Sequence, residues 1–190
     1  MAILIVGLVL FSMSHLIPSF PKMRENIIGC SGLKRYKLVF SLVSAISVGL
    51  IVYGFNIAPG SMLYVPTESG NLAAIVLMFP ATYLFMSNSV ASPPSSAQFY
   101  TAHPLNWGVI LWCISHLVTN GDLPGVIMFS TFLLVSLVSI YSGNKRGAKP
   151  KKDVRPPVSR ELVFLIAVAI VYSALLWGHG YIAGRPVIGF

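Results

Sequence analysis

Residues Pro104 to Ser142, PLNWGVILWCISHLVTNGDLPGVIMFSTFLLVSLVSIYS, contain two apolar runs separated only by the turn residues Asn-Gly-Asp-Leu-Pro-Gly. A helix that spans a lipid bilayer needs about 20 apolar residues, with a range of about 17–25. The runs 104–120 and 124–142 have this length, so the stretch predicts a tight hairpin of two transmembrane helices. Asn-Gly is expected to end the first helix and Asp122 to cap the second, whose first turn holds Pro124.

The composition of the whole chain also indicates a membrane location. Of its 190 residues, 55% are hydrophobic and 9% are charged, and the mean hydropathy is +0.78. Soluble domains carry about 25% charged residues, so this chain has too little charge to cover a water-facing surface. The two cysteines, Cys30 and Cys113, are too few for a disulfide framework, and no CxxCH motif is present to attach c-type haem.

Six apolar runs are long enough to span a bilayer. In chain order they cover residues 2–19, 38–58, 71–88, 104–120, 124–142 and 161–179. The sequence therefore predicts an all-α polytopic membrane bundle of about six transmembrane helices. No internal repeat or separate soluble segment interrupts the pattern, so residues 1–190 are expected to form a single domain.

The basic residues indicate how this bundle is oriented. The connections 18–37 and 143–160 hold 12 of the 13 Lys and Arg residues, and Arg185 is the remaining one. Six spans place both connections on one side, which the positive-inside rule makes the cytoplasmic side, with both termini opposite. The net charge of +8 is thus expected to face lipid headgroups and not nucleic acid. Binding of a ligand carboxylate is the alternative role for these residues.

All four histidines, His15, His103, His116 and His179, lie in or at the end of a predicted span. Ionisable groups within a membrane are costly and usually serve a function. Acidic residues occur only at loops and helix ends, so imidazole is the available ligand, and it suits iron, copper or zinc. Imidazoles on facing helices also hold haem iron. We therefore expect a metal site, with haem b as the best fit; a proton relay and a hydrogen-bonded packing role are the alternatives.

Spacing limits which histidines can share one metal. His103 and His116 are 13 residues apart, about 20 Å along a helix, so they cannot both bind one iron. Depth in the membrane would pair His15 with His103 and His116 with His179, which would allow two sites. Cys113 lies one turn before His116 on the same face, as an alternative or paired ligand or as a small buried hydrophobic residue.

Three motifs resemble the NnrU family: SHLIPSFPKMR at 14–24, AHPLNWGVILWCISHLVTNGD at 102–122 and LLWGHGYIAGRPV at 175–187. The resemblance extends over essentially the whole chain. Ala102 stands where the family usually has Arg before His-Pro, and Ser115 stands where Ala usually precedes the next His. A role for that arginine in pairing an anionic group therefore does not carry over to this chain.

The domain is shared with the plant and algal zeta-carotene isomerase, so the resemblance implies a haem b cofactor. It implies His15 and His116 as the axial ligands, with Cys113 taking part in ligand exchange. We rank this pair before the depth-matched pairs, because helix tilt and the short fourth span change the depth of each histidine. The implied reaction is redox-gated cis-trans isomerisation of an apolar polyene such as zeta-carotene, reached from membrane lipid. Bacterial members are associated with denitrification and nitric oxide metabolism.

Three functional classes are therefore expected. The first is a haem-dependent carotenoid isomerase, and the second is a cytochrome-like membrane protein in nitrogen-oxide metabolism or electron transfer. The third is a structural subunit of a larger membrane complex. The expected location is a bacterial inner membrane or a plastid-type membrane.

Overall fold

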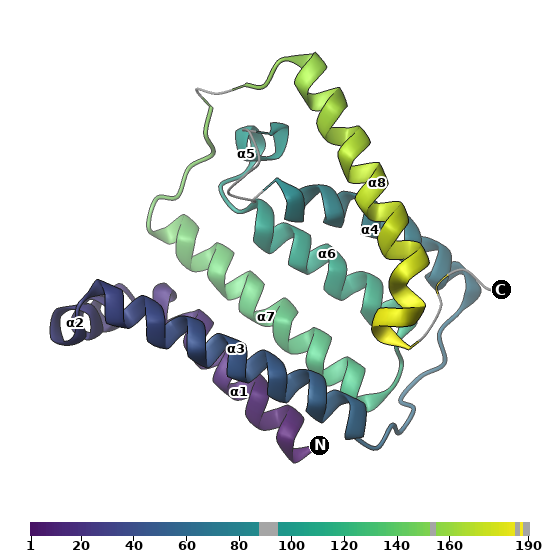
Figure 1. The fold of residues 1–190 in the computed structure, drawn as a ribbon, viewed down its shortest axis with the longest axis horizontal. Helices are drawn as coiled ribbons and strands as arrows, with labels where there is room; N and C mark the ends of the chain where they lie inside the picture. Colours follow the sequence, from purple (N-terminus) through teal and green to yellow (C-terminus); the bar gives the residue numbers. More distant parts are fainter. Residues whose placement is uncertain (88–94, 153–154, 185–186, 188–190) are drawn as a thin grey trace.

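The structure, a computed structural model, describes residues 1–87, 95–152, 155–184 and 187. Within these residues the regular elements are helices, which confirms the predicted all-α membrane bundle (Figure 1). The elements are α1 (Ala2–Leu16), the 3-10 turn η1 (Ile17–Ser19), α2 (Pro21–Ser31), α3 (Leu33–Ile57), α4 (Glu68–Met86), α5 (Ser96–Tyr100), α6 (Pro104–Thr119), α7 (Leu123–Lys145) and α8 (Val158–Ala183).

Each of the six predicted spans corresponds to a helix of the described chain. Five helices are long and apolar enough to cross a membrane: α1 with η1, α3, α4, α7 and α8. The sixth, α6, has 16 residues and is shorter than this criterion requires. It lies between α4 and α7 and packs on both (Figure 1). Its remaining surface is exposed, and Leu105 and Trp107 there are each 42% exposed. The short helices α2 and α5 were not predicted, and they lie in the connections between spans.

Close helix packing depends on small residues. The helices α1 and α3 form one antiparallel pair, α4 and α6 form another, and α7 contacts both α1 and α6 (Figure 1). A Cβ atom on Gly7 of α1 would lie 2.8 Å from the Ile51 backbone nitrogen, and one on Gly54 would meet the Leu4 backbone. Small residues at such contacts let transmembrane helices approach closely, where dispersion forces act. Leu4 and Ile51 are accordingly buried in the core.

Hydrogen bonds between connections show which ends of the helices lie together. At one end, the backbone N–H of Leu63 donates to the Gly121 carbonyl over 2.7 Å, joining the α3–α4 connection to the α6–α7 turn. At the opposite end, the Ser142 hydroxyl donates to the Ser19 carbonyl over 2.8 Å. The connections thus alternate between the two ends of the bundle, as the six predicted passes require. The predicted placement of Arg185 lies outside the described residues.

The Asn-Gly-Asp turn has the capping role that the sequence predicts. The Asp122 carboxylate accepts a hydrogen bond of 2.9 Å from the Gly125 backbone N–H, and Pro124 lies in the first turn of α7. Gly121 does not have a positive φ, so a left-handed backbone does not explain the glycine. A Cβ atom at Gly121 would instead collide with the Tyr64 carbonyl. Close approach of the α3–α4 connection therefore requires glycine here.

Tyr64 fastens this connection to the end of α6. Its hydroxyl donates to the Leu117 carbonyl and lies 3.1 Å from the Asn120 carbonyl. Partial burial and the nearby Asp122 carboxylate raise the pKa of Tyr64. The hydroxyl therefore stays protonated at neutral pH and remains available as a donor.

Candidate functional site

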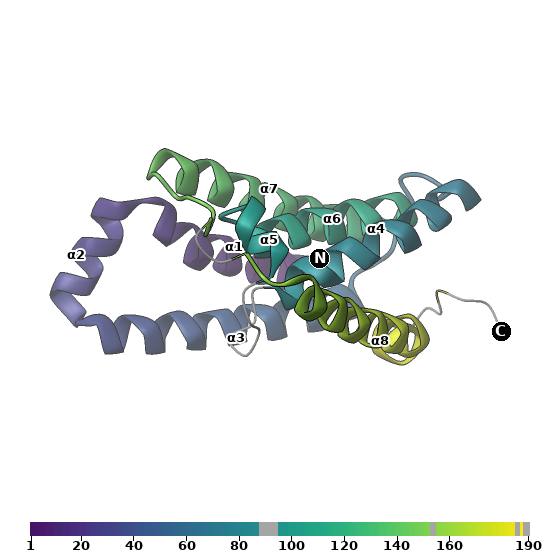
Figure 2. The same ribbon diagram turned by 90° about the horizontal axis from the view of Figure 1, so that it is seen from above.

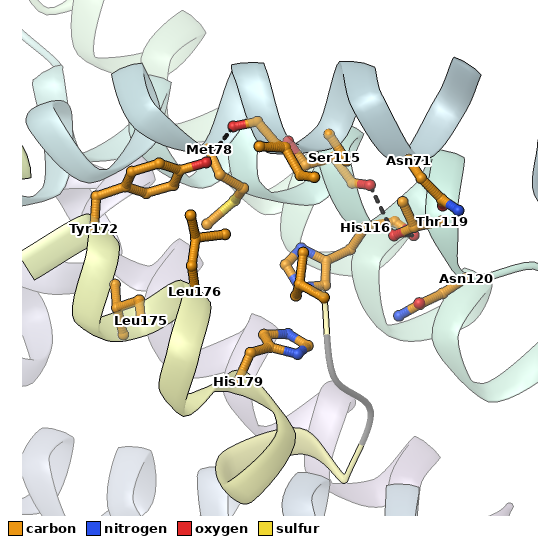
Figure 3. A pocket seen from close by; sticks show the side chains of 13 residues that line it. Asn71, Met78, Ser115, His116, Thr119, Asn120, Tyr172, Leu175, Leu176 and His179 are labelled. Carbon is orange, nitrogen blue, oxygen red and sulfur yellow. Dashed lines mark hydrogen bonds between the residues drawn. The ribbon is translucent and has the colours of Figure 1, made fainter. Parts of the chain in front are cut away.

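A pocket of about 230 Å³, the histidine pocket, lies between α4, α6 and α8, near the end of the bundle that holds the α6–α7 turn (Figure 3). His116 of α6 and His179 of α8 are the histidines among its described lining residues. Much of the remaining wall is apolar and is formed by Ile75, Met78, Leu175 and Leu176. The pocket thus combines two imidazoles with apolar surroundings, which is the chemistry that the sequence predicts for a haem or metal site.

The two histidine rings approach each other across this pocket. Their centroids are 6.1 Å apart, and the ring planes are inclined by 36°. Imidazole nitrogens bind a metal ion at about 2.0–2.1 Å, so two imidazoles on opposite sides of one ion have centres about 6 Å apart. The observed separation of His116 and His179 matches this spacing.

The orientation of the His116 ring is fixed by its own helix. Its Nδ1 atom lies 2.8 Å from the carbonyl oxygen of Trp112, one turn earlier, and donates to it as N–H. The ring also stacks on Phe129, with centroids 4.6 Å apart. Metal-binding histidines usually donate their second N–H to such a carbonyl, which leaves the other nitrogen with a lone pair. Nε2 of His116 is therefore the atom that can bind a metal.

His179 is placed by the packing of α8 on α4. The Tyr172 hydroxyl, seven residues before His179, donates to the Ile75 carbonyl of α4 over 2.6 Å. Residues seven apart lie on the same helix face, so this bond also directs His179 toward the pocket. Sequence reasoning did not identify Tyr172. The available signal was a polar aromatic residue in an apolar run, two turns before a histidine.

His15 has a similar local geometry in a different place. Its Nδ1 atom lies 3.0 Å from the Phe11 carbonyl, and its ring stacks on Phe11 at 3.8 Å. His15 lies near the end of α1 that leads into η1, and it is not among the described residues that line the histidine pocket. The structure therefore does not bring His15 and His116 together as facing side chains.

His103 joins two helices. It is the N-cap residue of α6, and its Nε2 atom lies 2.9 Å from the Asn144 side-chain oxygen of α7. A Cβ atom at Gly143 would collide with the His103 ring, so the ring packs directly on the α7 backbone. These contacts fit a hydrogen-bonded packing role for His103.

Cys113 is fully buried, with none of its surface exposed. Cys113 is not among the described residues that line the histidine pocket; α6 contributes Ser115, His116 and Thr119 to that lining. Its burial fits a small core residue, and its part in ligand exchange stays a prediction.

The two imidazoles are fewer protein ligands than a structural zinc site uses. Structural zinc sites use four protein ligands. In the described part of the chain, no group of three or more His, Cys, Asp or Glu side chains could hold a metal ion. Two imidazoles suffice for haem, because the porphyrin supplies the other four nitrogens. Ligand pockets usually measure about 300–1,000 Å³, so at about 230 Å³ the histidine pocket is too small for a haem unless the side chains of its wall repack while the two rings keep their separation.

The comparison with known proteins agrees with the motif resemblance. The family model described as NnrU protein matches residues 3–187, which include all four histidines. No curated protein and no solved structure matches the chain.

Proposed function

The chain belongs to the NnrU family, and from this premise we propose that it is an integral membrane protein that binds haem b non-covalently through His116. The observation that carries the proposal is the 6.1 Å separation of the His116 and His179 rings in a pocket whose wall is partly apolar. His116, through Nε2 in a fixed tautomer, and His179 on α8 would hold the haem.

The resemblance implies His15 as the second ligand, and this stays a competing assignment. His15 has the same preorganised Nδ1 contact with a carbonyl one turn earlier. It would need a different arrangement of α1 and α6 to reach the iron that His116 binds. His116 and His179 already line the same pocket, so the proposal assigns these two residues as the haem ligands.

The proposed activity is cis-trans isomerisation of an apolar polyene. When bound, haem supplies an iron whose exchangeable coordination position can interact with a double bond. The chain contributes apolar side chains, Ile75, Met78 and Leu176, against which a hydrocarbon can pack. His179 is the proposed exchangeable ligand, because it lies on α8, which packs chiefly on α4.

A cytochrome-like role in nitrogen-oxide metabolism or electron transfer is the second candidate. A row of aromatic rings supports it. Phe11, Phe132 and Trp112 follow one another between His15 and His116, with successive ring centroids from 3.8 to 5.8 Å apart. Two haems, one at each histidine, would be connected by this row of aromatic rings.

The visible spectrum of the full-length protein, purified in detergent from haem-replete cells, tests the cofactor. We expect a Soret band, and extraction with acid-acetone should release haem b. A folded but colourless preparation would overturn the haem proposal and leave the role of a structural subunit. Carotenoid extraction from a deletion strain then separates the two haem-dependent roles, since only loss of the isomerase leaves a cis-polyene to accumulate.

A further inference from the structure

A second pocket, of about 670 Å³, lies at the opposite end of the bundle from the histidine pocket. It is formed where α2 joins α1 to α3, beside the end of α7, and Figure 2 shows α2 at this extremity of the molecule. Its ionisable lining residues other than tyrosine are Arg24, Lys37, Arg146 and Glu25. Three basic side chains against one carboxylate give this cationic pocket a positive charge. None of its lining residues lines the histidine pocket, so a ligand bound here would not require haem.

The three basic residues come from separate parts of the chain. Arg24 lies on α2, Lys37 lies on α3, and Arg146 is the C-cap residue of α7. Contacts with neighbouring side chains position Arg24 and Arg146. The Arg24 guanidinium lies over the Tyr36 ring, 5.6 Å from its centroid, and the Arg146 guanidinium donates to the Ser142 hydroxyl. Folding thus gathers cations from both basic connections around one space.

We propose that the cationic pocket binds a phosphate group at the cytoplasmic membrane surface, presented by an anionic phospholipid or by soluble phosphate. Arginine side chains offer planar pairs of donors that match phosphate oxygens, and lysine adds a compact charge. Basic pockets between transmembrane helices on the cytoplasmic side suit anionic headgroups. The start of α2 also lies at this pocket, and a helix N-terminus favours negative charge.

The surroundings favour a lipid as the source of the phosphate. Phe40 and Pro18 give the cationic pocket apolar wall as well as charge. Beyond Lys37 on α3, Leu38 and Leu42 are 60% and 54% exposed, so an acyl chain can continue along the helix. A soluble phosphate would use the basic residues but would leave this apolar surface without a partner.

The test measures binding to delipidated full-length protein in detergent, through the rise in unfolding temperature. The probes are dihexanoyl phosphatidylglycerol, dihexanoyl phosphatidylcholine and sodium phosphate, compared at constant ionic strength. We expect a saturable rise with phosphatidylglycerol and little with phosphatidylcholine. The Arg24→Gln/Lys37→Gln/Arg146→Gln variant should bind phosphatidylglycerol at least about tenfold more weakly.

A matched variant controls for net charge. Lys22→Gln/Lys34→Gln/Lys149→Gln removes the same charge from basic residues outside the pocket lining, and should change the affinity by less than about twofold. Glu25→Gln should tighten binding, because it removes the one carboxylate of the lining. If the triple pocket variant does not fold, the single substitution Lys37→Gln, at an exposed position, is compared with the unsubstituted protein instead.

The binding results distinguish the cationic pocket from general surface charge, and a lipid from soluble phosphate. Equal weakening by the two triple variants would overturn the pocket, since general surface charge would then explain binding. Equal affinity for phosphatidylcholine and phosphatidylglycerol would also overturn it. Binding of sodium phosphate as tightly as phosphatidylglycerol, lost in the pocket variant alone, would support the site and assign it to soluble phosphate.

Discussion

At the scale of single residues, a bond within its own helix orients the His116 ring. Its Nδ1–H donates to the Trp112 carbonyl, and Phe129 holds the ring by stacking. Unsatisfied polar groups are costly inside a membrane. The intrahelical bond satisfies one ring nitrogen and leaves the other for a metal, so the ligand atom does not depend on a distant partner.

The histidines should therefore respond differently to substitution. We expect His116→Ala to abolish or strongly shift the Soret band, because it removes the preorganised Nε2 atom. His179→Ala should leave haem bound with an altered spin state, since one axial nitrogen remains. The spectra and the haem-to-protein ratio of purified variants provide the measurement.

His103→Ala is the matched control, because His103 binds Asn144 and does not line the histidine pocket. Its spectrum should match that of the unsubstituted protein. If His15→Ala changes the spectrum and His179→Ala does not, the pair implied by the family resemblance is correct. If His103→Ala removes the haem and His116→Ala does not, His116 is not a ligand.

Gly121 is the residue at which an added methyl group should be most disruptive to the α6–α7 turn. Gly121→Ala would force the turn away from Tyr64, breaking the contacts between two connections. We expect a loss of about 1–3 kcal/mol in the free energy of unfolding. Gly60→Ala is the control, because nothing lies within 4 Å of the added Cβ atom there. Thermal unfolding in detergent compares them, and equal melting temperatures would contradict the expectation.

At the scale of elements, α8 is the helix that decides the geometry of the histidine pocket. Among the helices it packs chiefly on α4. Glu161 near its start accepts from the Tyr83 hydroxyl and, over 3.2 Å, from the Ser96 backbone N–H. Tyr172 makes the second attachment, to the Ile75 carbonyl. Beyond Tyr172 the helix continues for seven residues to His179, so the bond fixes the segment of α8 that leads to this imidazole.

Tyr172→Phe should loosen the second axial ligand and leave the first in place. Without its bond to the Ile75 carbonyl, the segment of α8 that carries His179 is less firmly positioned. We expect faster binding of an external haem ligand such as carbon monoxide, at unchanged haem content. Tyr181→Phe is the control, because Tyr181 is 96% exposed. Equal binding rates in both variants would show that Tyr172 does not position His179.

At the scale of the whole molecule, alternating connections and concentrated basic charge determine the orientation. The α3–α4 connection lies at one end of the bundle, and η1, α2 and the end of α7 lie at the other (Figure 1). Most basic residues belong to the second end, so the positive-inside rule predicts that this end faces the cytoplasm.

Thiol labelling in oriented membranes tests this orientation. The exposed native Cys30 should react only from the cytoplasmic side, whereas buried Cys113 should stay unlabelled. In a Cys30→Ser background, Lys149→Cys should label from the cytoplasm. Val65→Cys, at a position 81% exposed, should label from the opposite side. Labelling of Val65→Cys and Lys149→Cys from the same side would remove the six-pass topology.

The sequence alone predicted the apolar helices of the bundle and how they are joined. Apolar length predicted all six helices, because a bilayer imposes nearly the same requirement on every span. The short α6 and the Asp122 cap also followed from local residues. The helices α2 and α5 did not, since both are too short and too polar to show that signal.

Only the tertiary structure decided which side chains meet. The expected depth of each histidine in the membrane suggested two pairs. The structure brings together one of them, His116 and His179. It also gathers Arg24 and Arg146, from connections more than a hundred residues apart, into one cationic pocket. The physical reason is that neighbouring helices are chosen by contacts such as Gly54 on Leu4, which depend on side-chain shape. Hydropathy and charge measure how residues interact with lipid and water, and they carry no information about that fit.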